Sequence, residues 1–233
     1  MKIAVITSIC GNKESLSNPT VVHSDVDYYA FVDIKNPKAT VWKQLSPYHF
    51  SNDKKYSNRR NAKIFKVLPE LFIHDYDYYF WVDASHDLIA SPQDIAKKYT
   101  SDDQPFAVFQ HLQRNCIYKE ALILKKLRYD YKDLITKEMK YFKSYGYPKE
   151  NGLYELSAFV KKRTHQSTLA SLKWWEYLSR YSSRDQISFP FVLWECKIKP
   201  TIMPGFANGF NAKGEIGNNE IMPQTRKHTP SGV

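Results

Sequence analysis

The sequence predicts an α/β protein with a mostly parallel central sheet flanked by helices. Short runs of aromatic and β-branched residues alternate along the chain with segments of helical apolar spacing. The short runs are apolar throughout, which is typical of strands that are covered on both faces. With 233 residues the chain can bury one full core, and no linker or internal repeat divides it.

Each predicted strand is a short apolar run that is followed by polar residues. The first, at about residues 2–9, is too short for a membrane span or a signal sequence. The second, at about 28–33, ends at Asp33, and the third, at 78–82, is followed by Asp83. Two further strands are predicted at about residues 106–109 and 156–160.

Each predicted helix shows an apolar stripe or a start signal. The helix at about 58–73 carries Phe65 and Leu68 on one face. Ser91 and Pro92 mark a second helix start, because the Ser side chain can cap the first turn and Pro fits its first position. Further helices are predicted at about residues 115–128, 131–144, 166–180 and 184–194.

The composition favours an anionic ligand. The chain has 34 Lys and Arg against 24 Asp and Glu, which gives a net charge of +10 and a pI near 9.3. Such a charge attracts nucleotide phosphates, nucleic acid or an anionic membrane surface. The 17 tyrosines suit a sugar or nucleotide cleft, since each offers an apolar ring and a hydroxyl. The three cysteines show no disulfide or metal spacing, so we expect a reducing compartment, the cytoplasm.

Asp83 is the first candidate functional residue, because it follows a predicted buried strand. In open α/β sheets, ligands bind at the carboxyl ends of the strands. A carboxylate there can hold Mg²⁺ or Mn²⁺, with Ser85, Asp87 or water as the next ligand and substrate phosphates supplying the rest. The alternative is a structural turn, since Asp and Ser side chains both bond to nearby backbone groups.

A basic segment supplies the second candidate site. Arg59 and Lys63 lie four residues apart and therefore share one face of the predicted helix. They can clamp a diphosphate, with Arg as a bidentate donor and Lys as a point charge. The alternative is a basic helix face that only contacts solvent.

Acidic residues at two further positions are candidates for catalysis. Asp185 and Gln186 begin a predicted helix and can face a sugar there; alternatively, Ser183 and Gln186 form a capping box and Asp185 only complements the helix dipole. Glu155 follows the glycine loop at Gly152, where it can meet an acceptor hydroxyl or simply lead into a strand. Phosphate-loop, dinucleotide, nucleophile-elbow and zinc patterns do not occur, which argues against kinase, dehydrogenase and hydrolase classes.

The ordered set of these segments resembles one protein family. The set comprises Arg59-Arg60-Asn61-Ala62-Lys63, Trp81-Val82-Asp83-Ala84, Phe109-Gln110-His111, Cys116-Ile117-Tyr118-Lys119-Glu120-Ala121, Gly152-Leu153-Tyr154-Glu155, Trp174-Trp175-Glu176 and Arg184-Asp185-Gln186-Ile187-Ser188-Phe189. It resembles a glycosyltransferase family that includes plant seed-mucilage and pollen proteins, with bacterial and viral members. The resemblance spans roughly residues 55–195.

The resemblance implies a GT-A fold, in which a Rossmann-like nucleotide-binding part is merged with an acceptor-binding part. We therefore expect a single domain over residues 1–233. Its nucleotide-sugar part would span about 1–110, its acceptor and catalytic part about 111–200, and a looped lid or tail rich in Gly, Pro and Asn 201–233. The family also implies a UDP- or GDP-sugar as donor and Mn²⁺ or Mg²⁺ as cofactor.

Individual residues match positions of known role in GT-A enzymes. Asp83, followed by Ala84, matches the metal-binding acid at the strand end, whereas Ser85 departs from the strict Asp-x-Asp form. Asp185 and Gln186 resemble the Asp-Gln pair that lies near the sugar.

Other matches concern the nucleoside and a further metal ligand. Thr7, Ser8 and Asp33 fall where such enzymes hold the base and the ribose. His228 resembles a late histidine that supplies a metal ligand in some members.

The sequence thus predicts a metal-dependent glycosyltransferase that moves a sugar from a nucleotide diphosphate donor to a glycan or other hydroxyl acceptor. If the enzyme inverts, Asp185 or Glu155 would take the acceptor proton. If it retains, Asp185 and Gln186 would stabilise an oxocarbenium-like state. The alternatives are a non-catalytic basic binding module and a GT-A fold without activity. Scattered basic residues without a nucleic-acid motif argue against nucleic acid, and any membrane contact would be peripheral, through the basic surface.

Overall fold

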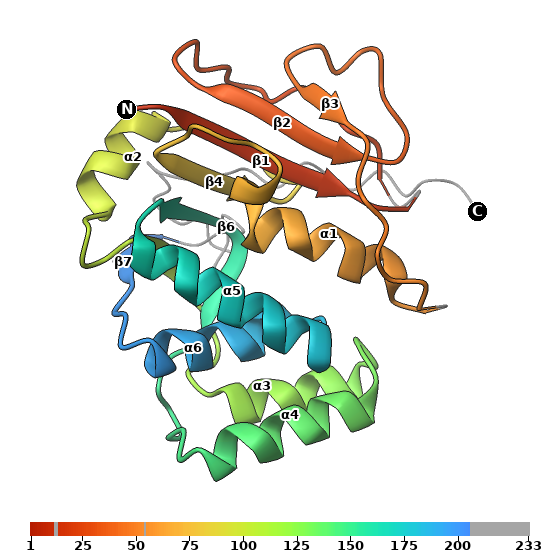
Figure 1. Cartoon of the computed structure of the whole chain (residues 1–233), viewed down its shortest axis with the longest axis vertical. Helices are drawn as coiled ribbons and strands as arrows, with labels where there is room; N and C mark the ends of the chain where they lie inside the picture. Colours follow the sequence, from red (N-terminus) through yellow and green to blue (C-terminus); the bar gives the residue numbers. More distant parts are fainter. Residues whose placement is uncertain (12–13, 54, 206–233) are drawn as a thin grey trace.

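The protein is a seven-stranded sheet with helices against its faces (Figure 1). The computed structural model describes residues 1–11, 14–53 and 55–205. The strands are β1 (Ile3–Ile9), β2 (Asp27–Val32), β3 (Lys43–Leu45), β4 (Tyr78–Val82), β5 (Phe106–Gln110), β6 (Tyr154–Lys162) and β7 (Thr201–Met203). The helices are α1 (Ser57–Val67), the 3₁₀ turn η1 (Pro69–Leu71), α2 (Pro92–Tyr99), α3 (Ile117–Lys126), α4 (Lys132–Ser144), α5 (His165–Arg180) and α6 (Asp185–Glu195).

The strand order confirms the predicted α/β class. The sheet runs β3-β2-β1-β4-β6-β5-β7, and among these seven strands β6 alone is antiparallel to its neighbours. β5 and β6 are adjacent in the sheet, and the chain between them forms α3 and α4. None of the helices in the described ranges has the length and apolarity needed to span a bilayer.

Two local expectations are corrected, and one strand was not predicted. The helix expected at 58–73 ends at Val67, because Leu68 precedes Pro69 and cannot easily keep helical dihedrals. Thr201–Met203, expected within a looped tail, is instead strand β7, which pairs with β5. β3 also escaped prediction, because its Lys-Gln-Leu sequence lacks strand-forming residues and pairing with β2 defines it. The rest of the expected tail, residues 206–233, lies outside the described residues.

The core has two faces, because side chains alternate along the strands. Ala4 and Ile6 of β1 lie in the larger cluster with residues of α1, α3, α4, α5 and α6. Ile3 and Val5 lie in a second cluster, with Ile95 and other residues of α2. The sheet is therefore covered on both sides, as its apolar strands predicted (Figure 1).

The carboxyl ends of β1, β2 and β4 meet at one edge of the sheet (Figure 1). The amino-terminal half of α1 lies at this edge, and so does the start of the antiparallel strand β6. The backbone N–H of Asp83 donates to the carbonyl of Ser157 on β6 over 2.7 Å, which fixes the residue directly after β4. Polar side chains from segments far apart in the sequence are thereby brought together.

Candidate functional site

A cavity of about 290 Å³ opens at this edge, which we call the strand-end cavity. It is lined by the end of β1, the segment after β4 and the first turns of α1. Its residues are Ser8, Ile9, Cys10, Glu14, Asn58, Arg59, Ala62, Lys63, Trp81, Asp83, Ala84 and Ser85. Six of the predicted ligand-binding residues are among them: Ser8, Arg59, Lys63, Asp83, Ala84 and Ser85. Such a volume is at the lower end of ordinary ligand sites, which are about 300–1,000 Å³.

The Asp83 carboxylate is held by a side-chain hydrogen bond, and the turn that follows β4 is closed by backbone groups. The turn is closed by backbone groups, with the N–H of His86 donating to the Asp83 carbonyl over 2.8 Å. The indole N–H of Trp81 donates to Asp83 Oδ1 over 2.6 Å. Ser85 Oγ lies 3.0 Å from His86 Nδ1. The predicted structural turn is therefore present, and it leaves Asp83 among the residues that line the cavity.

Helix α1 brings the predicted basic pair to the same cavity. Arg59 donates to the backbone carbonyl of Tyr129, and its guanidinium carbon lies 5.5 Å from the ring centre of Tyr56. Lys63 Nζ lies 2.7 Å from Asp185 Oδ2. Burial lowers the pKa of Lys63 to about 8, against the opposing effect of the Asp185 carboxylate. The pair is thus fixed by protein contacts, which a purely solvated helix face would not show.

Asp185 is buried between two lysines of α1. Its Oδ2 accepts from Lys63 at 2.7 Å and lies 2.5 Å from Lys66 Nζ, which the sequence analysis did not single out. The Lys66 ammonium also lies 5.3 Å from the Trp81 ring centre, over its face. Burial by itself would raise the pKa of Asp185, but Lys63 and Lys66 hold it far below its usual range. Asp185 is therefore ionised and a weak base.

Two of the three predicted nucleoside contacts are differently placed from expectation. Thr7 is fully buried and does not line the strand-end cavity, because alternation along β1 turns it away from Ser8. Asp33 links two loops instead of lining the cavity. Its carboxylate accepts from the Gly11 N–H and lies beside His49 Nε2, each over 2.6 Å. Within this predicted set, Ser8 alone lines the cavity.

The predicted capping box at the start of α6 is not formed. The N-cap residue is Arg184, whose side chain makes no capping bond. Ser183 Oγ donates instead to Asp130 over 2.6 Å. Gln186 Oε1 accepts from Arg184 over 3.2 Å. Ser183 and Gln186 have the spacing of a capping box, but the Ser183 hydroxyl bonds to the buried Asp130 carboxylate and not to the helix backbone.

The predicted metal ligands do not all come together. Asp87 is buried and does not line the strand-end cavity, and His228 lies outside the described residues. Glu155, predicted as a catalytic residue and not as a metal ligand, is also buried and does not line this cavity. In the described part of the chain, no group of three or more His, Cys, Asp and Glu residues is placed to hold a metal by itself. Asp83 and Ser85 offer two oxygen ligands. This set fits Mg²⁺ or Mn²⁺, which keep several waters and also bind substrate phosphates.

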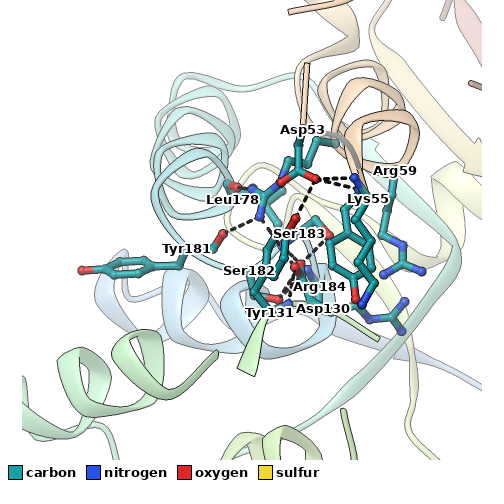
Figure 2. A network of polar contacts seen from close by, with 12 residues as sticks. Asp53, Lys55, Arg59, Asp130, Tyr131, Leu178, Tyr181, Ser182, Ser183 and Arg184 are labelled. Atoms are coloured by element: carbon teal, nitrogen blue, oxygen red, sulfur yellow. Dashed lines mark hydrogen bonds and ion pairs between the residues drawn. The ribbon is translucent and has the colours of Figure 1, made fainter. Parts of the chain in front are cut away.

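A buried polar network holds the segment that leads into α6 (Figure 2). Asp130 Oδ2 accepts from both the backbone N–H and the hydroxyl of Ser183, each over 2.6 Å. Arg60 of α1 donates to the carbonyl of Tyr181 over 3.1 Å and pairs with Asp130 at 3.7 Å. Asp185 follows this segment directly, so the network fixes where its carboxylate meets α1.

Glu138 belongs to this network, and its carboxyl group holds its proton more tightly in the folded protein than in water. It is fully buried, its Oε2 accepts a long bond of 3.4 Å from the Ser182 N–H, and its Oε1 has no hydrogen-bond partner among the described residues. Burial above all, with the nearby Asp130 charge, raises the pKa of Glu138 well above its usual range. The folded protein therefore keeps this proton at pH values at which the unfolded chain has begun to release it.

We expect Glu138→Gln to stabilise the protein at neutral pH. Above about pH 4.3 the unfolded parent releases the Glu138 proton and the folded parent keeps it, so stability falls as pH rises. Gln cannot release a proton, so the variant lacks this loss. Urea unfolding of both proteins at about pH 4 and pH 7 measures the effect. A stability difference that is the same at both pH values would contradict a protonated Glu138.

Comparisons with known proteins add a family and a fold. The family described as "TOD1/MUCI70, glycosyltransferase-like domain" matches residues 1–209. The "Probable hexosyltransferase MUCI70" of Arabidopsis thaliana is 26% identical over 168 residues, which cover 67% of this chain and 28% of that protein. The chain thus spans little more than a quarter of this relative.

Two solved glycosyltransferases superpose on this chain at low sequence identity. The bifunctional glycosyltransferase WbbM, in its apo structure, superposes with a TM-score of 0.51 at 10% identity, over 87% of this chain and 39% of that one. Mouse xyloside xylosyltransferase 1, in its apo form, gives a TM-score of 0.49 at 6% identity, over 88% and 86% of the two chains. The likeness to WbbM shows a shared fold.

Proposed function

Since the chain belongs to the TOD1/MUCI70 glycosyltransferase-like family, we propose that it transfers a sugar from a nucleotide diphosphate donor to a hydroxyl acceptor, with the help of a divalent cation. The observation that carries this proposal is the strand-end cavity. Asp83 and Ser85 line it from the sheet, and Arg59 and Lys63 line it from α1. A cavity with oxygen ligands for a cation and basic groups for an anion suits a metal-bound diphosphate.

The residues of the cavity would bind the leaving diphosphate in two ways, through a cation and through direct contacts. Asp83, with Ser85, would hold Mn²⁺ or Mg²⁺, which when bound offsets negative charge on the departing phosphates. Arg59 and Lys63 would bind the phosphate oxygens directly. Both cations are fixed by protein contacts before the ligand arrives, so little reorganisation is needed as charge develops.

Asp185 is proposed to position these cations rather than to take the acceptor proton. A general base works best with a pKa near the working pH, and Lys63 and Lys66 keep the pKa of Asp185 far lower. Its place between two lysines instead fixes the Lys63 ammonium at the cavity. This positioning role differs from both catalytic roles predicted for Asp185, which were taking the acceptor proton and stabilising an oxocarbenium-like state.

The proposal is tested by measuring UDP or GDP released from a panel of UDP- and GDP-sugars, with Mn²⁺ or with EDTA. We expect slow, metal-dependent hydrolysis of one donor class. Melting temperatures measured with different ligands distinguish the transferase from the alternative, a basic binding module. Stabilisation by UDP or GDP with Mn²⁺, and not by oligonucleotides, supports the transferase; the reverse pattern would establish the binding module.

We expect nucleoside diphosphate binding to weaken as Lys63 loses its proton. Since the pKa of Lys63 is lowered to about 8, affinity should fall about tenfold between about pH 7 and pH 9.5. Burial raises the pKa of the neighbouring Cys10 thiol to about 11, so that thiol does not titrate in this range. Titration calorimetry with UDP, GDP and Mn²⁺ across the range measures the effect.

Lys63→Arg is the matched variant, because arginine stays charged throughout this range. Its affinity should change little with pH. A second variant, Lys63→Met, should bind weakly at every pH. If the parent's affinity did not depend on pH, Lys63 would not contact the phosphates.

A further inference from the structure

A second cavity of about 780 Å³ lies next to the first, and we call it the helix cavity. It is lined by α1, the carboxyl-terminal half of α5 and the loop before α1, together with a few residues of neighbouring segments. Lys63 lines both cavities, so the two share this residue. The donor diphosphate is assigned to the strand-end cavity, so the larger helix cavity has no assigned ligand.

One wall of the helix cavity is aromatic. Phe50 and Trp175 are in edge-to-face contact, with ring centres 5.0 Å apart and planes at 79°. Phe50 is 38% exposed and Trp175 is partly exposed. Rings that are open to solvent and held against each other offer a rigid apolar surface. The C–H groups on the faces of a pyranose ring can pack on such a surface while the sugar hydroxyls point elsewhere.

Polar groups also line the cavity, beside a few apolar side chains. Ser179, Asn52 and Asp53 are among its lining residues and can bond to hydroxyl groups. Partial burial acts to raise the pKa of Asp53, but backbone N–H donors from Tyr56 and Lys55 lower it. Its carboxylate is therefore ionised at neutral pH and can accept hydrogen bonds from a sugar.

The charges of the cavity argue for a neutral ligand. Its three cationic lining residues are each paired with a carboxylate: Arg60 with Asp130 at 3.7 Å, Lys63 with Asp185 at 2.7 Å and Arg180 with Glu176 at 2.8 Å. Arg60 and Arg180 are thus engaged, and Lys63 is assigned to the donor diphosphate, so an acidic polymer would find no further cation among these residues and would meet the Asp53 carboxylate. A neutral glycan carries no such penalty.

We propose that the helix cavity binds a neutral glycan as the acceptor, with the hydroxyl that receives the sugar directed toward Lys63. This inference rests on the proposed transferase function and extends it to the second substrate. The aromatic pair would bind sugar rings away from the reacting end. Lys63 would mark the boundary between acceptor and donor diphosphate, because it lines both cavities.

The test uses the full chain and four hexasaccharide probes. Three are neutral, the β-1,4-linked hexamers of glucose, xylose and mannose, and one is acidic, the α-1,4-linked hexamer of galacturonic acid. Calorimetry gives their affinities for the parent and for Trp175→Ala. We expect at least one neutral probe to bind and the variant to lose about tenfold or more in affinity, the effect of an aromatic anchor. Binding of UDP or GDP with Mn²⁺ should not change.

Two more variants control for folding. Trp175→Phe keeps a ring and should restore most of the affinity, and Trp194→Ala removes a 38% exposed Trp that lines a different cavity. Thermal melts confirm that each variant is folded. Tighter binding of the acidic probe, loss of binding in Trp194→Ala but not in Trp175→Ala, or no neutral binding at all would overturn the inference.

The outcomes separate the two proposals. If UDP and GDP bind but glycan affinity does not depend on Trp175, the acceptor site is wrong and the transferase proposal stands. If glycan binding depends on Trp175 and neither nucleotide binds or is released, the site holds a glycan but the transferase proposal fails.

Discussion

Replacing Asp83 by Asn is expected to abolish Mn²⁺-dependent binding of UDP or GDP, with a loss of about 100-fold or more. The neutral amide is a much poorer ligand for a hard cation than a carboxylate. The fold should be retained, since the Asn side-chain oxygen can still accept from the Trp81 indole that now bonds to Asp83. Calorimetry with and without Mn²⁺ measures the loss.

Two controls sharpen this experiment. Ser85→Ala removes the second oxygen of the same site and should cause a smaller loss, because water can replace a hydroxyl. Asp102→Asn makes the same chemical change at a side chain that is 83% exposed and should leave binding unchanged. A protein with Asp83→Asn that bound nucleotide and Mn²⁺ like the parent would show that Asp83 is not a metal ligand.

Replacing Asp185 by Asn is expected to destabilise the protein by about 3–5 kcal/mol, because it leaves Lys63 and Lys66 without their common partner. An acid that only complemented a helix dipole would contribute about 0.3–1 kcal/mol. The larger loss corresponds to a fall of about 6–20 °C in the melting temperature of a chain of this size. Denaturant unfolding, with the slope compared between variants, measures it.

The pH dependence and a double variant identify the cause. Because the folded pKa of Asp185 is depressed, its stabilisation is complete above about pH 4 and is lost only in stronger acid. The difference between parent and variant should therefore persist throughout the neutral range. Adding Lys66→Met to Asp185→Asn removes one unpaired buried cation and should recover part of the stability. A single variant within about 1 kcal/mol of the parent would return Asp185 to the helix-dipole role.

The sequence predicted those features that local patterns encode. The apolar runs of β1 and β4 gave the sheet, and the strand-end position of Asp83 placed it at the cavity. The four-residue spacing of Arg59 and Lys63 correctly placed both side chains on the cavity side of α1. The resemblance to a glycosyltransferase family is confirmed by the match over residues 1–209. Metal, donor and the division into parts remain predictions.

Features that depend on distant contacts could not be predicted. Lys66 meets Asp185 across 119 positions of sequence, and no local spacing signals such a pair. Thr7 and Ser8 are neighbours in sequence, yet only Ser8 reaches the cavity, because a strand turns successive side chains to opposite faces. Phe50 and Trp175 form one wall only because α1 packs against α5. Periodicity identifies elements, whereas these sites arise from how the elements pack.

The position of α3 and α4 between two adjacent strands has a consequence for how this protein can diversify. Residues 111–153 leave the sheet after β5 and return to its neighbour β6, so they form an insertion within what would otherwise be a hairpin. This insertion supplies Asp130, which fixes the start of α6, and Tyr129, which holds Arg59. Changes in its exposed surface can therefore remodel the surroundings of the site while the strand register stays the same. The strand register does not depend on the exposed surface of this insertion, whereas the positions of Arg59 and of the start of α6 do.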